Sequence, residues 1–191
     1  MLEIKKRSLR EYALYSGIIS LGIILDQLTK WLAVKFVATA PDRIIEVIPG
    51  IFNFSYTENK GAAFGSFEDS RWVFLLTSTI MIVALSLYLY LGLTDSKVQQ
   101  ISVAVVLSGG IGNMIDRLGA GFAMGEFCVV DFLEFAFVDF AIFNAADAFV
   151  CVGAVLLFIA MLSDMIKEER EKKLQANTSD EGCDKSDGKG E

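Results

Sequence analysis

Ionisable and amide side chains stand inside or beside otherwise apolar stretches of this chain, at spacings that fit a helix. Asp26 and Lys30 are four positions apart, so in a helix they share a face and can pair. Two further sets follow the same spacing: Asn113 with Asp116 and Arg117, and Asn144 with Asp147. Each group therefore has a neighbour that can satisfy it away from water. Any one set alone fits a self-capped helix end, but all of them together with Asp131 indicate one shared site.

Carboxylates are the best candidates for acid–base chemistry here, because the chain contains no histidine. This excludes Ser-His-Asp and Cys-His nucleophile systems and every histidine-containing metal site. Two carboxylates a few ångströms apart cannot both ionise, so they share one proton. The ionised member can take a proton from an attacking water, and the protonated member can polarise a peptide carbonyl and later protonate the leaving amine. Such hydrolysis needs no metal or other cofactor, and we expect none.

The remaining composition narrows the function further. The cysteines Cys128, Cys151 and Cys183 are far apart and odd in number, so neither a zinc site nor a disulfide framework is expected. The formal net charge of −7 argues against a nucleic-acid partner, because such proteins usually carry a basic face. Nothing in the sequence demands an oligomer, and we expect a monomer among membrane lipids.

Apolar segments must hold these polar groups in place. The chain is 53% hydrophobic with a mean hydropathy of +0.49, and a membrane-spanning helix needs about 20 apolar residues. The pattern predicts a mainly α-helical membrane protein, one domain over residues 1–174, with a small β-sheet and loop region outside the membrane. Its four transmembrane helices are expected at about residues 12–37, 72–93, 98–117 and 143–166.

Basic residues predict how these spans are oriented. Lysines and arginines flank the outermost spans: Lys5, Lys6, Arg7 and Arg10 before the first, and Lys167, Arg170, Lys172 and Lys173 after the last. This excess predicts that both termini lie in the cytoplasm. At about 1.5 Å per helical residue, Asp26, Asp116 and Asp147 then all lie toward the outer interface of the bilayer.

The segments outside the spans differ in character. Residues 51–57 alternate aromatic and polar side chains, as a half-buried strand does, and Pro49-Gly50 predicts a turn after a partner strand at 43–48. We therefore expect a small β-region within residues 38–71. Residues 175–191 are charged and rich in Asp, Gly, Ser and Lys, which is typical of a disordered tail.

Short motifs along the four predicted spans resemble those of lipoprotein signal peptidase, also called signal peptidase II. The resemblance covers about residues 17–165 and is specific because five motifs occur in the right order. They are Asp26-Gln27-Leu28-Thr29-Lys30, Asn59-Lys60-Gly61-Ala62-Ala63-Phe64-Gly65, Gly112-Asn113-Met114-Ile115-Asp116-Arg117, Val129-Val130-Asp131-Phe132 and Phe143-Asn144-Ala145-Ala146-Asp147.

The resemblance implies an intramembrane aspartyl endopeptidase of the bacterial cytoplasmic membrane, with its active site toward the outer face. Such an enzyme removes the signal peptide from prolipoproteins and cleaves N-terminal to a diacylglyceryl-modified cysteine. Asp131 and Asp147 are then the implied catalytic dyad. The other implied residues are Asn59, Gly61, Asn113, Arg117 and Asn144 for substrate binding, and Asp26, Lys30 and Asp116 for structural support.

Two alternatives stay open at the sequence level. A second Val-Asp-Phe at 138–140 offers Asp139 as the partner of Asp147, although Asp139 falls where the link to the last span would run. Residues 119–125 look like a local insertion relative to the family.

The alternative function is a small ion-coupled transporter, which also carries intramembrane aspartates and lysines. Against it, the sequence shows no internal repeat and no second broken span at a matching position.

Overall fold

Long helices dominate the part of the chain that the structure, a computed structural model, describes: residues 7–60, 71–123 and 127–184. Within these residues the helices are α1 (Leu9–Leu32), α2 (Arg71–Tyr90), α3 (Lys97–Arg117) and α4 (Ala145–Asp184). Each is long and apolar enough to cross a membrane. This confirms the predicted mainly α-helical membrane fold.

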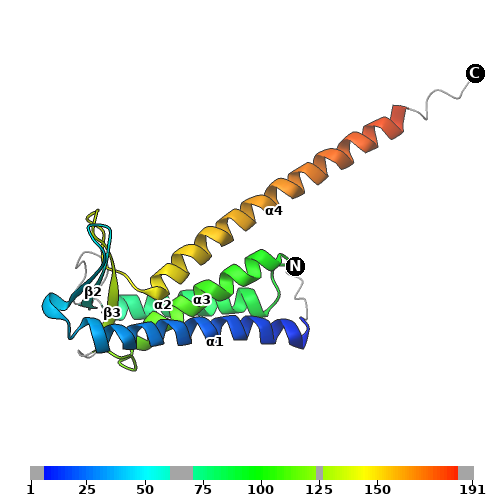
Figure 1. Cartoon of the computed structure of the whole chain (residues 1–191). Helices are drawn as coiled ribbons and strands as arrows, with labels where there is room; N and C mark the ends of the chain where they lie inside the picture. The colour runs from blue at the N-terminus through cyan, green and yellow to red at the C-terminus, as the bar shows by residue number, and fades with distance from the viewer. Residues whose placement is uncertain (1–6, 61–70, 124–126, 185–191) are drawn as a thin grey trace, which may run out of the picture.

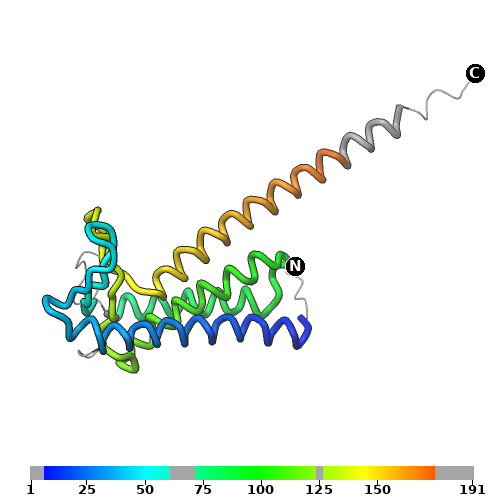
Figure 2. Tube along the Cα trace, viewed as in Figure 1, coloured from blue at the N-terminus to red at the C-terminus, as the bar shows by residue number. Residues whose placement is uncertain are grey.

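The helices run along one another, with the β-sheet at one end. α1, α2 and α3 form a bundle, and α4 packs against α3 before it extends past the other helices (Figure 1). Figure 2 shows the start of α1 and the α2–α3 link at the end away from the sheet. The predicted site residues on α1, α3 and α4 lie at the other end of the bundle, the end that carries the sheet.

The outer faces of the helices are apolar. Trp72 of α2 is 73% exposed and Phe158 of α4 is 68% exposed, and both belong to long series of exposed aliphatic and aromatic side chains. A contiguous apolar surface of this kind needs lipid rather than water around it. The chain is therefore a multi-pass membrane protein.

A three-stranded antiparallel sheet closes one end of the bundle. Its strands are β1 (Ile44–Ile48), β2 (Phe52–Asn59) and β3 (Val129–Phe135), in the order β1-β2-β3. β1 and β2 form the hairpin that the sequence predicted. β3 was not predicted; it pairs with β2 so that Thr57 lies opposite Asp131.

Two apolar clusters connect these parts. Tyr15, Leu89, Val103, Ala104 and Leu107 form a buried cluster between α1, α2 and α3. A second cluster joins the sheet to the π-helical turn that continues α1, and its buried members are Ala33, Val37, Tyr56, Val130 and Phe132. The second cluster holds β3 against the end of α1, which fixes the height of Asp131.

Helix α4 differs from the prediction at both ends. It begins at Ala145 rather than at Phe143, because Phe143 forms a β-bridge with Leu133 of β3. Its backbone stays helical to Asp184, whereas the sequence predicted a disordered tail from residue 175. Residues 167–176 are all Glu, Lys, Arg, Gln, Leu or Ala, which favour helix and carry α4 beyond the predicted end of its span at residue 166.

Candidate active site

The pairing between β3 and the residue before α4 brings two parts of the site together. The backbone N–H groups of Phe132 and Leu133 donate to the Phe143 carbonyl at 2.9 and 2.8 Å, and the Phe143 N–H donates to the Leu133 carbonyl at 3.0 Å. The chain then enters α4 at once. Asp147, in the first turn of α4, therefore lies near Asp131 of β3.

Asn144 contacts both aspartates. Its Nδ2 donates to Asp131 Oδ1 at 2.6 Å, and its backbone N–H donates to Asp147 Oδ2 at 3.1 Å. The Asp147 N–H donates back to Asn144 Oδ1 at 3.1 Å, which makes Asn144 and Asp147 a reciprocal cap at the start of α4. Asn144 therefore caps the start of α4 and also reaches Asp131 through its side-chain amide nitrogen. The helix cap and the shared site that the sequence suggested are both present.

Two further asparagines complete the hydrogen bonding of the carboxylates. Asn59, at the end of β2, donates through Nδ2 to Asp131 Oδ2 at 2.9 Å. Asn113 of α3 donates through Nδ2 to Asp147 Oδ1 at 2.8 Å. Each aspartate therefore accepts an amide hydrogen bond on each of its two oxygens, which holds it in a defined orientation.

Lys30 lies at the centre of a buried ionic group beneath the asparagines. Its Nζ is 2.8 Å from Asp26 Oδ2 and 2.7 Å from Asp116 Oδ2, and it donates to Asn113 Oδ1 at 2.8 Å. The lysine and both carboxylates are at most 1% exposed. A buried charge is tolerated only when it is paired, so these residues depend on one another. The ammonium also fixes the orientation of the Asn113 amide, whose Nδ2 then faces Asp147.

The same group connects three helices. Asp26 Oδ1 accepts a hydrogen bond from the Ala146 N–H of α4 at 3.0 Å. Gln27 Nε2 lies within 3.2 Å of Asp26 Oδ2, Asp116 Oδ1 and the Gly112 carbonyl. The sequence reasoning did not assign Gln27 to the site, although an amide in the middle of a span was a signal for it. A Cβ at Gly112 would lie 2.5 Å from Asp26 Oδ2, so only glycine permits this approach of α1 and α3.

Burial changes the acidity of Asp131, which lies outside the spans and is 2% exposed. Removal from water raises the pKa of Asp131 to about 6, and the nearby Asp147 charge raises it as well. The hydrogen bonds from Asn59 and Asn144 act in the opposite direction and favour its charged form. Asp131 therefore holds a proton at pH values where an ordinary aspartate has lost it.

Asp147 and Arg117 face a cavity between the helices. The cavity has a volume of about 310 Å³ and is lined by apolar side chains of α2 and α3 together with Asn113, Arg117, Asp147 and Val150. The Arg117 guanidinium lies 5.7 Å from the centre of the Phe74 ring of α2. Asp147 is half-buried and lies on the wall of this cavity. A substrate chain in the cavity can therefore contact it without any unfolding of the protein.

Other predicted residues lie elsewhere. Asp139 is exposed in the link between β3 and α4, whereas the side-chain amides of Asn59 and Asn144 donate to Asp131. Gly61, expected to bind substrate, lies outside the described residues. The remaining predicted site residues all lie in the arrangement described above. They are Asn59, Asn113, Arg117, Asn144, Asp26, Lys30 and Asp116.

Comparisons with known proteins agree on one family. The family model for signal peptidase (SPase) II matches residues 18–163. Lipoprotein signal peptidase of Clostridium tetani is 40% identical over 157 residues, which cover 81% of this chain and 96% of that protein. Lipoprotein signal peptidase of Caldanaerobacter subterraneus subsp. tengcongensis is 36% identical over 145 residues, covering 76% and 93%.

Solved structures show the same fold. Two structures described as a bacterial membrane enzyme are both 29% identical to this chain and cover 85% of it, with TM-scores of 0.67 and 0.66. They are matched over 94% and 99% of their own chains. The chain therefore belongs to the signal peptidase II family and is an endopeptidase of the aspartic type.

Proposed function

We propose that this chain removes the signal peptide from prolipoproteins by cutting N-terminal to a diacylglyceryl-modified cysteine, with Asp131 and Asp147 as the catalytic dyad. The observation that carries the proposal is that two carboxylates, Asp131 on strand β3 and Asp147 on helix α4, are both hydrogen-bonded by one asparagine, Asn144. One of them, Asp147, also lines a cavity open to a substrate. An ion-coupled transporter is set aside, because the chain belongs to a family of peptidases.

The dyad cuts the peptide bond with one shared proton. The ionised carboxylate takes a proton from water as the water oxygen bonds to the scissile carbonyl carbon. The protonated carboxylate donates a hydrogen bond to the carbonyl oxygen. It then transfers that proton to the leaving nitrogen as the carbon–nitrogen bond breaks. One proton remains on the pair afterwards. Burial of Asp131 supports this scheme, because its raised pKa of about 6 lets the dyad keep a proton between about pH 4 and pH 6, where an ordinary aspartate is already ionised.

The surrounding residues divide into two groups. Asn113 and Asn144 were expected to bind substrate, but their amides are hydrogen-bonded to the dyad, to each other and to Lys30. We assign both as positioning residues. Asn59 also donates its side-chain amide to Asp131, so it joins the positioning residues. Arg117 lies beside Asp147 on the cavity and can donate to substrate carbonyls, so it stays our candidate for substrate binding together with Gly61. Asp26, Lys30 and Asp116 support the site from below.

The site lies at the outer face of the bacterial cytoplasmic membrane in this proposal, with both termini in the cytoplasm. The lysines and arginines that flank the first and last spans support this orientation. The cut bond then lies where a lipidated cysteine would rest, close to the lipid headgroups.

A cleavage assay with purified protein and a diacylglyceryl-modified prolipoprotein tests the dyad. We expect Asp131→Asn and Asp147→Asn each to lower kcat/KM by about 100- to 10,000-fold, the usual contribution of a positioned acid or base. Asp139→Asn is the matched control and should cleave as the unaltered protein does, because Asp139 is exposed and away from the pair.

The outcomes separate the parts of this proposal. Loss of cleavage in Asp139→Asn with normal cleavage in Asp131→Asn would show that the dyad assignment is wrong. Failure of the unaltered protein to cut any lipidated prolipoprotein would overturn the function itself. Equal cleavage of lipidated and unlipidated prolipoprotein would overturn only the requirement for the diacylglyceryl group.

A further inference from the structure

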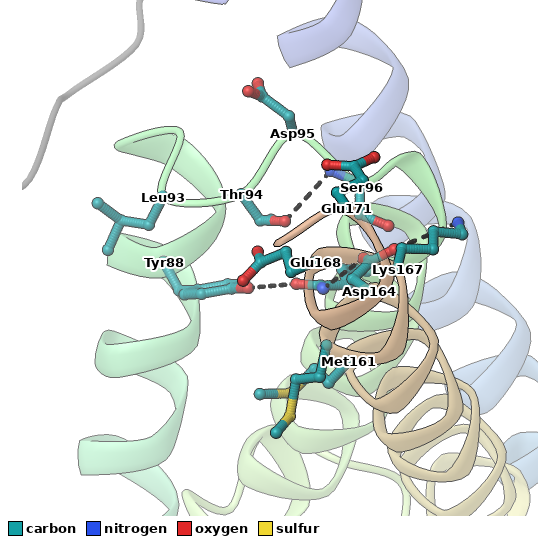
Figure 3. Close-up of a pocket in the computed structure, with 12 residues that line it drawn as sticks. Tyr88, Leu93, Thr94, Asp95, Ser96, Met161, Asp164, Lys167, Glu168 and Glu171 are labelled. Carbon is teal, nitrogen blue, oxygen red and sulfur yellow. Dashed lines mark hydrogen bonds and ion pairs between the residues drawn. The ribbon is translucent and has the colours of Figure 1, made fainter. Parts of the chain in front are cut away.

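A second cavity lies at the end of the bundle away from the dyad (Figure 3). It has a volume of about 700 Å³ and is formed by the end of α2, the α2–α3 link, the start of α3 and a distant part of α4. Five charged side chains line it, namely Asp95, Asp164, Lys167, Glu168 and Glu171. In the proposed orientation this cavity opens at the cytoplasmic face.

A chain of hydrogen bonds across three helices builds one wall of this cavity. The Tyr88 hydroxyl of α2 donates to Gln99 Oε1 of α3, and Gln99 Nε2 donates to Asp164 Oδ2 of α4 at 2.9 Å, as Figure 3 shows. Gln99 is only 7% exposed, and both hydrogen bonds are partly buried. They fix the spacing of α2, α3 and α4 at this end and hold the Asp164 carboxylate at the cavity.

The charges around the cavity favour a cation. Four of the five charged lining residues are carboxylates. Lys167 Nζ lies 3.5 Å from Asp164 Oδ1, so an ammonium already approaches this carboxylate, in a partly exposed pair of a kind that contributes little to stability. Two other basic side chains at this end already have partners, since Lys97 pairs with Glu11 and Arg7 donates to the Leu89 and Thr94 carbonyls.

The two cavities lie on the same faces of the same helices. On α2, Leu85 lines the first cavity and Tyr88 lines the second, less than one turn later. On α4, Val150 lines the first and Met161 the second, about three helical turns apart. A segment lying along these faces of α2 and α4 would therefore pass from the dyad to the acidic cavity.

We propose that the second cavity binds the basic N-terminal region of the signal peptide while its cleavage site lies at the dyad. A signal peptide has a positively charged start, an apolar stretch of about 7–15 residues and a small-residue cleavage site. Asp147 and Asp164 are about 26 Å apart along α4, at 1.5 Å per residue. An apolar helix of about 15 residues covers roughly 22 Å of this span, and a short extended segment before the cut covers the rest.

This inference rests on the proposed function and adds a specificity site to it. The test compares two lipidated prolipoproteins that differ only in three lysines or three glutamines at the start of the signal peptide. For the unaltered protein we expect kcat/KM to be about 3- to 10-fold higher with lysines at low salt, and this preference should shrink as salt screens the charges.

Charge-reversed variants locate the effect. Glu168→Lys with Glu171→Lys should remove or invert the preference and leave kcat/KM on the glutamine substrate unchanged, because both residues are far from the dyad. Glu169→Lys is the matched control; Glu169 lies on the same part of α4 but not on the cavity, so the preference should persist. Equal kcat/KM for both substrates, or equal effects of the cavity and control variants, overturns the binding site alone. Cleavage of neither substrate overturns the proposed function.

Discussion

At the scale of single residues, Asn144 determines the geometry of the dyad. Its backbone N–H, its side-chain oxygen and its side-chain nitrogen are all used, on Asp147, Asp131 and Asn113. An aspartate of the same shape would lack the amide donor for Asp131 and would place a third carboxylate beside Asp131 and Asp147. A buried polar group with every partner in place is rigid, so Asn144 fixes the positions of the two carboxylates of the proposed dyad relative to each other.

The pH dependence of cleavage should follow the acidity of Asp131. Its pKa is raised to about 6 by burial, so the dyad loses its proton as the pH rises through this value and kcat/KM should fall. The hydrogen bond from Asn59 favours the charged form of Asp131 and lowers its pKa. Asn59→Leu removes this bond, so the pKa rises and the alkaline limb of the kcat/KM profile should move to higher pH.

Asn53→Leu provides the control for this shift. Asn53 lies on the same strand, and its Nδ2 donates to Glu134 at 3.2 Å rather than to the dyad. Its profile should keep the alkaline limb of the unaltered protein even if its overall rate changes. An Asn59→Leu limb that stays in place, or moves to lower pH, would contradict the role given to Asp131.

At the scale of elements, the contact between α3 and α4 positions Asp147. Glycines allow the two backbones to approach: a Cβ at Gly109 would overlap the Ala146 carbonyl and lie 2.9 Å from Val150 Cγ2. Ala146 directly precedes Asp147, so any shift of α4 here moves the Asp147 carboxylate of the proposed dyad. Close packing of helices through small residues is a common solution in membranes.

Two neighbouring glycines of α3 therefore make a sharp comparison. Gly109→Ala should lower the apparent Tm in detergent and strongly reduce cleavage, because α4 must move away from α3. At Gly110 a Cβ would lie 3.6 Å from the nearest atom, an ordinary contact with Ile82. Gly110→Ala should leave Tm unchanged or raise it slightly, since alanine favours helix over glycine by about 1 kcal/mol. Equal Tm values for the two variants would show that this approach is unimportant.

The elements also show what a sequence can and cannot predict. The helices were predictable because hydropathy over about 20 residues is a local property, and Asp26 with Lys30 was predictable from helical spacing alone. Strand β3 was not, because its pairing with β2 joins residues such as Asn59 and Val129 that are far apart in the chain. Asp131 itself was predicted from a motif. The hydrogen bond from Asn59 that holds it depends on the pairing of β2 with β3, which was not predicted.

At the scale of the whole molecule, polar chemistry is concentrated at the two ends of an apolar body. The dyad and the sheet lie at one end, and the acidic cavity lies at the other, beside the link between α2 and α3. The apolar faces between them are exposed and require lipid. The proposed reaction therefore requires a fixed orientation, with the sheet outside the cell and the link inside.

Labelling of single cysteines in intact cells tests this orientation. In a background with Cys128, Cys151 and Cys183 replaced by alanine, Glu46→Cys places a thiol on exposed β1 and Asp95→Cys places one in the exposed link. A membrane-impermeant maleimide should label the β1 thiol in intact cells and the link thiol only after permeabilisation, because the lysines and arginines flanking the first and last spans predict that the termini lie in the cytoplasm. Both variants must still cleave prolipoprotein, which shows that they are inserted correctly. Labelling of the link thiol alone in intact cells would show that the orientation is the reverse of the proposed one. The dyad would then lie on the wrong side of the membrane for exported substrates.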